Sequence, residues 1–184
     1  MLSEQGRKKL LDIARKTVEA AVSGKVTPRF DVQDEELQQP QGAFVTLKTN
    51  GKLRGCIGQF VATDPLWQVV AEMADAAATK DMRFFGQQLT PGEMGDLDIE
   101  ISVLSPLEET DDPLAEMELG KHGIYIMRDR RSGCFLPQVA TETGWSKEQF
   151  LSKCCSGKAG LPPSAWQDPD TTVYLFTCDI LEEG

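Results

Sequence analysis

The stretch AFVTLKTNGKLRGCIGQF, residues 43–60, places two apolar-rich runs on either side of the dipeptide Asn50-Gly51. Asn-Gly is the preferred dipeptide of a type I′ turn, so the stretch predicts a β-hairpin with a two-residue loop. That loop fixes three facing pairs, namely Thr49 with Lys52, Leu47 with Arg54, and Val45 with Cys56. Because side chains alternate along a strand, we expect Arg54, Cys56 and Gly58 on one face of the hairpin.

Hydrophobic periodicity predicts helices and strands on both sides of this hairpin. An apolar residue recurs every four positions between Ser3 and Val22, which predicts a helix. Residues 25–42 are polar, contain two prolines and read as a long irregular connection. The other expected elements are helices over 65–79 and 146–158 and strands over 97–105, 123–127 and 173–181. Without strict βαβ repetition, this mixture predicts an α+β fold with a mainly antiparallel sheet flanked by helices.

The length and charge of the chain argue against several classes of protein. With 184 residues and a mass of 20.3 kDa, we expect one domain over residues 1–184, either simple or two-lobed. The net charge of −10 and the pI near 4.6 argue against non-specific nucleic-acid binding and against an anionic membrane surface. No apolar run approaches the roughly 18 residues of a membrane span, and the N-terminus lacks a secretory signal. We therefore expect a cytoplasmic protein.

Cysteine and histidine usage gives no sign of a metal centre. The five cysteines form no CxxC pair and His122 is the single histidine, so the spacing of a zinc site is absent. We therefore expect reduced thiols. Cys154 and Cys155 are adjacent on an expected helix, so we expect that the two side chains do not both face inward. The sequence also lacks P-loop, GxGxxG, HExxH, EF-hand and GxSxG patterns, so it identifies no cofactor.

The run LRGCIG, residues 53–58, is the first candidate for chemistry. A thiol is nucleophilic as the thiolate, and a nearby cation favours that form, so Arg54 either assists Cys56 or binds an anionic substrate beside it. Gly55 and Gly58 flank the thiol, and a strand glycine marks close approach of a ligand. The alternative is structural, because free cysteine is among the most buried residue types.

Three further side chains are weaker candidates. Glu100 lies on the polar face of the strand over 97–105 and is a candidate general base, although a solvated strand face explains it as well. His122 would act as an acid or base; the alternative is a loop residue that lies on the surface or forms a local hydrogen bond. Gln138 offers two donors and an acceptor to a ligand, or else it lies where Pro137 ends a strand and the next segment begins.

Several of these runs together resemble the AMMECR-type domains, whose bacterial members are also called AmmeMemoRadiSam system protein A. The resemblance covers essentially the whole chain, with the motifs in the family's order: GAFVTL (42–47), LRGCIG (53–58), DPLWQVV (64–70), LTPGEM (89–94), DIEISVLSP (98–106), FLPQVA (135–140), KAGLPPSAW (158–166) and VYLFT (173–177). It implies an intracellular two-lobed protein with a cleft and a sheet core similar to the RAGNYA fold. It also implies that residues 53–58 line a site, and that the partners are Memo-like and radical SAM proteins.

The resemblance implies no settled activity, so three functions stay open. In the first, the protein is an enzyme acting on a small molecule, a nucleotide or a modified base. Cys56 would be its nucleophile or ligand-contacting thiol and Arg54 its anion-binding cation, with Glu100 or His122 as the acid–base group. In the second, it is a non-catalytic adaptor that holds a partner segment in the same cleft. In the third, it binds RNA at a local site, which the charge of −10 disfavours.

Overall fold

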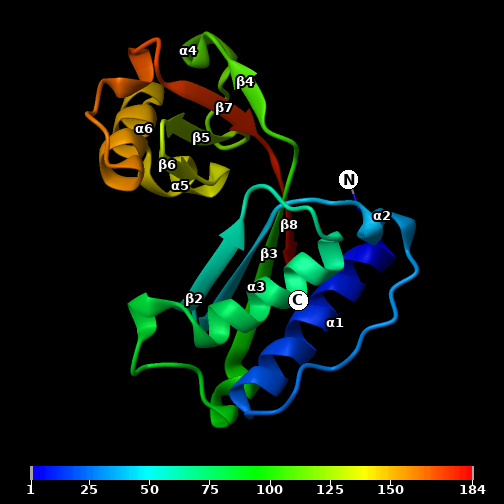
Figure 1. Cartoon of the computed structure of the whole chain (residues 1–184). Helices are drawn as coiled ribbons and strands as arrows, with labels where there is room; N and C mark the ends of the chain where they lie inside the picture. Colours follow the sequence, from blue (N-terminus) through cyan, green and yellow to red (C-terminus); the bar gives the residue numbers. More distant parts are fainter. Residues whose placement is uncertain (1, 184) are drawn as a thin grey trace. The chain divides into compact units, whose positions relative to one another are not determined.

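The computed structural model describes residues 2–183, with helices and strands mixed along the chain (Figure 1). The chain divides into two compact units. The first contains the described residues up to Leu104 and those from Asp179 onward, and the second is Ser105–Cys178. Each unit has a four-stranded antiparallel sheet with helices packed against it, so the predicted α+β class is confirmed.

The first sheet is built on the predicted hairpin. Its strands, in order across the sheet, are β2 (Lys52–Gln59), β1 (Ala43–Thr49), β3 (Leu97–Leu104) and β8 (Cys178–Glu182). At the turn, Asn50 and Gly51 have φ angles of 51° and 73°. A type I′ turn requires positive φ at both central positions, which explains why the Asn-Gly dipeptide is a reliable signal here.

The predicted register of the hairpin holds only next to the turn. A β-bulge lies between Leu47 and Lys48 of β1, and the observed pairs on its far side from the turn are Leu47 with Gly55, Thr46 with Cys56, and Val45 with Ile57. The predicted cross-strand partners of Arg54 and Cys56 were therefore wrong. At a bulge, two residues of one strand lie opposite a single residue of the neighbouring strand. Turn geometry specifies the first pair, but it carries no information about a residue inserted later in the ladder.

Two helices cover one face of the first sheet (Figure 1). They are α1 (Glu4–Val22), which lies where the helix between Ser3 and Val22 was predicted and has Ser3 as its N-cap, and α3 (Leu66–Thr79). Their apolar stripes and the inward side chains of the strands form one buried cluster that includes Leu10, Val18, Val70, Ala74, Val45, Leu47, Ile99 and Ile101. The short 3-10 turns η1 (Met82–Phe84) and η2 (Pro91–Asp96) lie between α3 and β3.

Two of the expected segments differ in the structure. The connection over 25–42 contains one helical turn, α2 (Glu35–Gln38). The single strand expected over 173–181 is instead split at Thr177, with β7 (Thr172–Phe176) in the second sheet and β8 in the first. Thr177 bonds to Ser105 at this point. Its N–H donates to Ser105 Oγ at 2.9 Å, and its carbonyl accepts from the Ser105 N–H at 2.9 Å.

The second unit is built around its own sheet. The strands, in order, are β4 (Glu108–Thr110), β7 (Thr172–Phe176), β5 (Gly123–Arg128) and β6 (Arg131–Phe135). The helical segments are α4 (Pro113–Glu116), α5 (Pro137–Thr143), α6 (Lys147–Cys154), the π-helical turn η3 (Cys155–Ala159) and the 3-10 turn η4 (Ala165–Gln167). β6 ends at Phe135 and α5 begins at Pro137. The segment around Gln138 therefore follows the structural alternative, in which a strand ends at Pro137 and the next segment begins.

Candidate functional site

Both glycines of the LRGCIG run lie where the backbone is packed too closely for a side chain. A Cβ atom at Gly55 would lie 2.1 Å from the carbonyl oxygen of Ala77, so β2 passes directly against α3. A Cβ atom at Gly58 would lie 2.3 Å from the ring of Phe44, its cross-strand partner. An aromatic ring over a strand glycine helps to fix register. Packing within the first unit therefore accounts for both glycines, and their contact with a substrate stays a prediction.

The Arg54 side chain is held by the segment between α3 and β3. Its guanidinium forms an ion pair with Glu93 and donates to Thr49 Oγ1 at 3.1 Å and to the Gln87 carbonyl at 3.1 Å. Hydrogen bonds from Arg54 and then from Thr90 lower the pKa of Glu93 from 4.5 to about 2. Arg54 therefore joins β2 to this segment, and binding an anionic substrate would require it to leave Glu93.

Arg54 and Cys56 lie on opposite faces of the hairpin. Thr49 Oγ1 accepts a hydrogen bond from Arg54 at 3.1 Å. The Thr46 hydroxyl donates to Cys56 Sγ at 3.3 Å. Thr46 and Thr49 are three positions apart on β1, so their side chains point to opposite faces. The prediction that Arg54 and Cys56 share a face is thus wrong, because the bulge changes the alternation of side chains between them.

An ion pair holds the backbone of Cys56 at the edge of the sheet. β2 is an edge strand, and the Cys56 N–H donates to Asp81 Oδ2 at 2.9 Å. The Cys56 carbonyl accepts from Arg83 Nη2 at 3.0 Å, and Arg83 pairs with Asp81 at 2.6 Å. Hydrogen bonds from Arg83 and from Cys56 lower the pKa of Asp81 from 3.8 to about 2. The two side chains thus supply the bonds that a further strand would make with Cys56.

Cys56, Thr46 and Glu100 form a row across three strands, here termed the polar row. Thr46 is the cross-strand partner of Cys56 on β2 and of Glu100 on β3. The row lies on the face opposite the helices, because Leu47, the neighbour of Thr46, points into the helix-covered cluster. Lys48 forms an ion pair with Glu100 at 2.9 Å. Two strand spacings of about 4.8 Å separate Cys56 from Glu100, so a ligand lying over Thr46 would reach both.

His122 and Gln138 belong to the second unit, so the predicted site residues divide between the two units. Nδ1 of His122 accepts from the backbone N–H of Glu118 at 3.0 Å, which leaves the proton of the neutral ring on Nε2. His122 also lines a cavity of about 220 Å³ together with two glutamates. Gln138 is the second residue of α5 and is half-buried.

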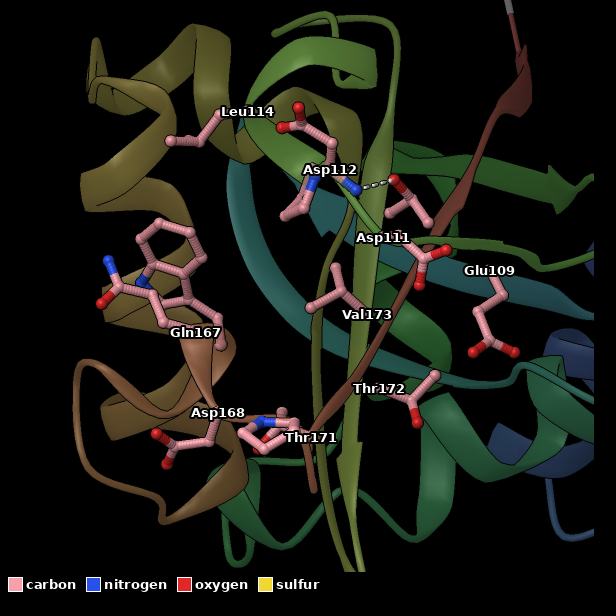
Figure 2. A pocket seen from close by; sticks show the side chains of 13 residues that line it. Glu109, Asp111, Asp112, Leu114, Gln167, Asp168, Thr171, Thr172 and Val173 are labelled. Carbon is pink, nitrogen blue, oxygen red and sulfur yellow. Dashed lines mark hydrogen bonds between the residues drawn. The ribbon is translucent and has the colours of Figure 1, made fainter.

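A second cavity of the second unit, of about 310 Å³, was not expected from the sequence. Figure 2 shows it between the β4 side, with Glu109 and Asp111, and the opposite side, with Gln167 and Asp168. A signal was present in the run Glu-Thr-Asp-Asp, residues 109–112, which places three carboxylates within four positions. The sequence could not indicate that these carboxylates border a cavity, because the facing residues come from η4 and β7.

The adjacent cysteines of α6 and η3 are both buried, contrary to expectation. Cys154 and Cys155 are each 0% exposed and belong to the core of the second unit. The π-helical turn begins at Cys155, and the chain then folds back so that the Leu161 N–H donates to the Cys155 carbonyl at 2.8 Å. Burial raises the pKa of both thiols. These two cysteines therefore pack as small apolar side chains.

Residues 2–183 offer no group of three or more His, Cys, Asp or Glu side chains arranged to hold a metal ion. Within the same range, no helix is both long and apolar enough to cross a membrane.

Comparison with known proteins identifies the family. The chain is 40% identical over 188 residues to a protein of Methanothermobacter thermautotrophicus, an alignment that covers 99% of this chain and 96% of that protein. It is 43% identical over 180 residues to Protein NEQ441 of Nanoarchaeum equitans, covering 95% and 98%. The crystal structure of the uncharacterized protein PH0010 from Pyrococcus horikoshii matches with a TM-score of 0.88 and 36% identity, over 99% of this chain and 93% of that chain. The AMMECR1 family model matches residues 11–181, and the chain therefore belongs to the AMMECR1 family.

Proposed function

We propose that this AMMECR1-family protein binds a small molecule, a nucleotide or a modified base at the polar row, with Cys56 as the nucleophilic or ligand-contacting thiol. One observation carries the proposal: Thr46 pairs with Cys56 on one side and with Glu100 on the other. A thiol, a hydroxyl and a carboxylate thereby share one face of one sheet, within reach of a single ligand.

The chemistry follows from the contacts at the sulfur and at Glu100. The Thr46 hydroxyl donates to Cys56 Sγ at 3.3 Å, and sulfur accepts such a bond best as the thiolate, its nucleophilic form. Glu100 would exchange a proton with the bound ligand as the acid–base group. The Lys48 ammonium, 2.9 Å from Glu100, would supply the positive charge for an anionic group. Lys48 then takes the role that the sequence suggested for Arg54.

Alkylation of the native protein with iodoacetamide, followed for each cysteine by mass spectrometry, tests this proposal. We expect Cys56 to react in the folded protein, and Thr46→Val to change the rate of that reaction at pH 7, because the variant removes the hydroxyl donor. The buried Cys154 is the internal control and should react only after unfolding in urea. If Cys56 likewise reacts only in urea, its thiol is unavailable to ligands and the nucleophilic role is rejected.

A non-catalytic adaptor is the second candidate, favoured by the architectural contacts of Arg54, Gly55 and Gly58. The hairpin would then be a recognition surface, and the family resemblance suggests Memo-like and radical SAM proteins as partners in the cytoplasm. Cys56→Ser separates the two candidates, because an adaptor would keep its partner in a pull-down, whereas the enzyme would lose turnover of its ligand. An Arg54 variant would be a poor probe, since it also breaks the ion pair with Glu93.

A further inference from the structure

The guanidinium of Arg83 lies beside Cys56 and is held from several sides. Its Nε donates to Asp81 Oδ1 at 3.0 Å, and its Nη2 donates to Asp81 Oδ2 at 2.6 Å and to the Cys56 carbonyl at 3.0 Å. Its Cζ lies 5.6 Å from the centre of the Phe84 ring. A guanidinium that is already fixed loses little freedom when it binds a further group, so Arg83 is preorganised to contact a ligand.

These contacts leave part of the Arg83 side chain unused. A guanidinium has five N–H groups, and the bonds to Asp81 and Cys56 use those of Nε and Nη2. The N–H groups of Nη1 have no acceptor among residues 2–183. The Arg83 side chain is 57% exposed, whereas that of Asp81 is 4% exposed. The ion pair therefore encloses its carboxylate and leaves its guanidinium open to solvent.

The side chain of Cys56 also interacts with this guanidinium. The pKa of Arg83 is raised, first by its hydrogen bond with Asp81 and further by the charge of Cys56 and a hydrogen bond with the Cys56 side chain. Lys48, the other cation near the polar row, lies at the opposite end of the row, 2.9 Å from Glu100. Arg83 is therefore the cation at the thiol end of the row.

We propose that Arg83 is a specificity-determining residue of the polar row, which selects a ligand with a carboxylate or phosphate group next to the atom that Cys56 contacts. The inference rests on the proposed function, in which the thiol of Cys56 contacts a ligand. The unused N–H groups of Nη1 would donate to the oxyanion. Because the chain has a net charge of −10, a fixed local cation would also offset the general repulsion of an anionic ligand.

Two alkylating reagents that differ in charge test the proposal. Iodoacetamide is neutral, and iodoacetate carries a carboxylate beside the same reacting carbon. In both reactions the Cys56 thiolate forms an S–C bond and iodide leaves. Both rates are measured at Cys56 in the folded full chain at pH 7 by mass spectrometry, and the ratio of the iodoacetate rate to the iodoacetamide rate is the selectivity. We expect a selectivity above that of N-acetylcysteine, and a fall of about threefold in Arg83→Gln, as for the loss of one exposed charge pair.

The selectivity separates ligand binding from a structural role of Arg83. A change in access to the thiol would alter both rates together and leave their ratio unchanged. Arg83→Lys keeps a cation and should retain part of the selectivity. Arg29→Gln removes the same charge at an exposed position outside the polar row and should retain all of it. Should Arg83→Gln not fold because Asp81 is left unpaired, the comparison of Asp81→Asn/Arg83→Gln with Asp81→Asn makes the same measurement.

The possible failures are distinguishable. If the selectivity is unchanged without Arg83, or is lost only in Lys48→Gln, the role of Arg83 is rejected and the proposed function stands. If Cys56 reacts with neither reagent in the folded protein, its thiol is inaccessible and both proposals are rejected. Protection of Cys56 from iodoacetamide by acetate or by inorganic phosphate, compared at equal ionic strength, shows which oxyanion Arg83 prefers.

Discussion

Replacing Asp81 by asparagine is the sharpest test of how the edge of the first sheet is held. The Asp81 carboxylate accepts from the Cys56 N–H at 2.9 Å, from Arg83 Nε at 3.0 Å and from Arg83 Nη2 at 2.6 Å. Its side chain is only 4% exposed, so these bonds form largely out of water. An amide has the same shape, but it carries no charge and presents one acceptor oxygen in place of two.

The size of the effect follows from the pKa of Asp81. Its fall from 3.8 to about 2, at roughly 1.36 kcal/mol per pKa unit, stabilises the folded state by about 2 kcal/mol. Because the folded pKa is the lower one, the unfolded chain binds the proton more readily. The stabilisation is therefore complete above about pH 5 and is lost as the pH falls through 4 towards 2. Asp81→Asn should cost about 2 kcal/mol at pH 7 and progressively less below pH 4.

Urea unfolding of both proteins at pH 7 and at pH 3 measures this difference, and comparing them cancels the titration of other groups such as Glu93. Asp12→Asn is the matched control, because Asp12 is 55% exposed and its ion pair with Lys16 should contribute less than about 0.5 kcal/mol. Hydrogen exchange of the Cys56 amide gives a local readout and should accelerate in Asp81→Asn. Equal stability of the two variants at pH 7, with unchanged exchange at Cys56, would refute the role assigned to Asp81.

Three further outcomes follow from the packing. Gly55→Ala should destabilise the protein by about 3 kcal/mol in thermal or urea unfolding, because its Cβ would lie 2.1 Å from the Ala77 carbonyl oxygen. Gly92→Ala, with nothing within 4 Å of the added atom, should change stability far less, and equal losses would contradict this explanation. Ser3→Ala removes the N-cap of α1 and should cost about 1 kcal/mol by the same assay, unless the cap bond contributes nothing. The Cys154 thiol should stay unlabelled by iodoacetamide at pH 8 while the protein is folded, and rapid labelling would show that it is not buried in solution.

Sequence reasoning succeeded where structure depends on neighbouring residues. The turn at Asn50-Gly51, the helix that starts near Ser3 and the end of a strand before Pro137 are each specified by residues within a few positions. It failed where structure involves residues far apart in the sequence. Arg54, beside the bulge, pairs with Glu93, thirty-nine positions away, and the residues of the hairpin do not indicate that ion pair.

The candidate site shows the same division. Cys56 and Glu100 were both selected from local patterns, but their common row depends on the pairing of β1 with β3. Local patterns do not reveal which strands become neighbours. The face shared by Arg54 and Cys56 was predicted from strand alternation alone, which a single bulge invalidates. The acidic cavity was missed because its two sides come from segments more than fifty residues apart.

The LRGCIG run can now be separated into residues that build the fold and the atom left for chemistry. Without a side chain, Gly55 lets α3 pack against β2, and Gly58 leaves room for the Phe44 ring. Arg54 forms an ion pair with Glu93. The backbone of Cys56 also bonds to the Asp81–Arg83 pair, but any residue except proline would offer the same N–H and carbonyl. The fold does not require the chemistry of the sulfur atom. Serine at position 56 would keep the shape of the side chain and could still accept a hydrogen bond from the Thr46 hydroxyl. A loss of function in Cys56→Ser with unchanged stability would therefore report thiol chemistry, whereas changes at the other positions alter fold and site together.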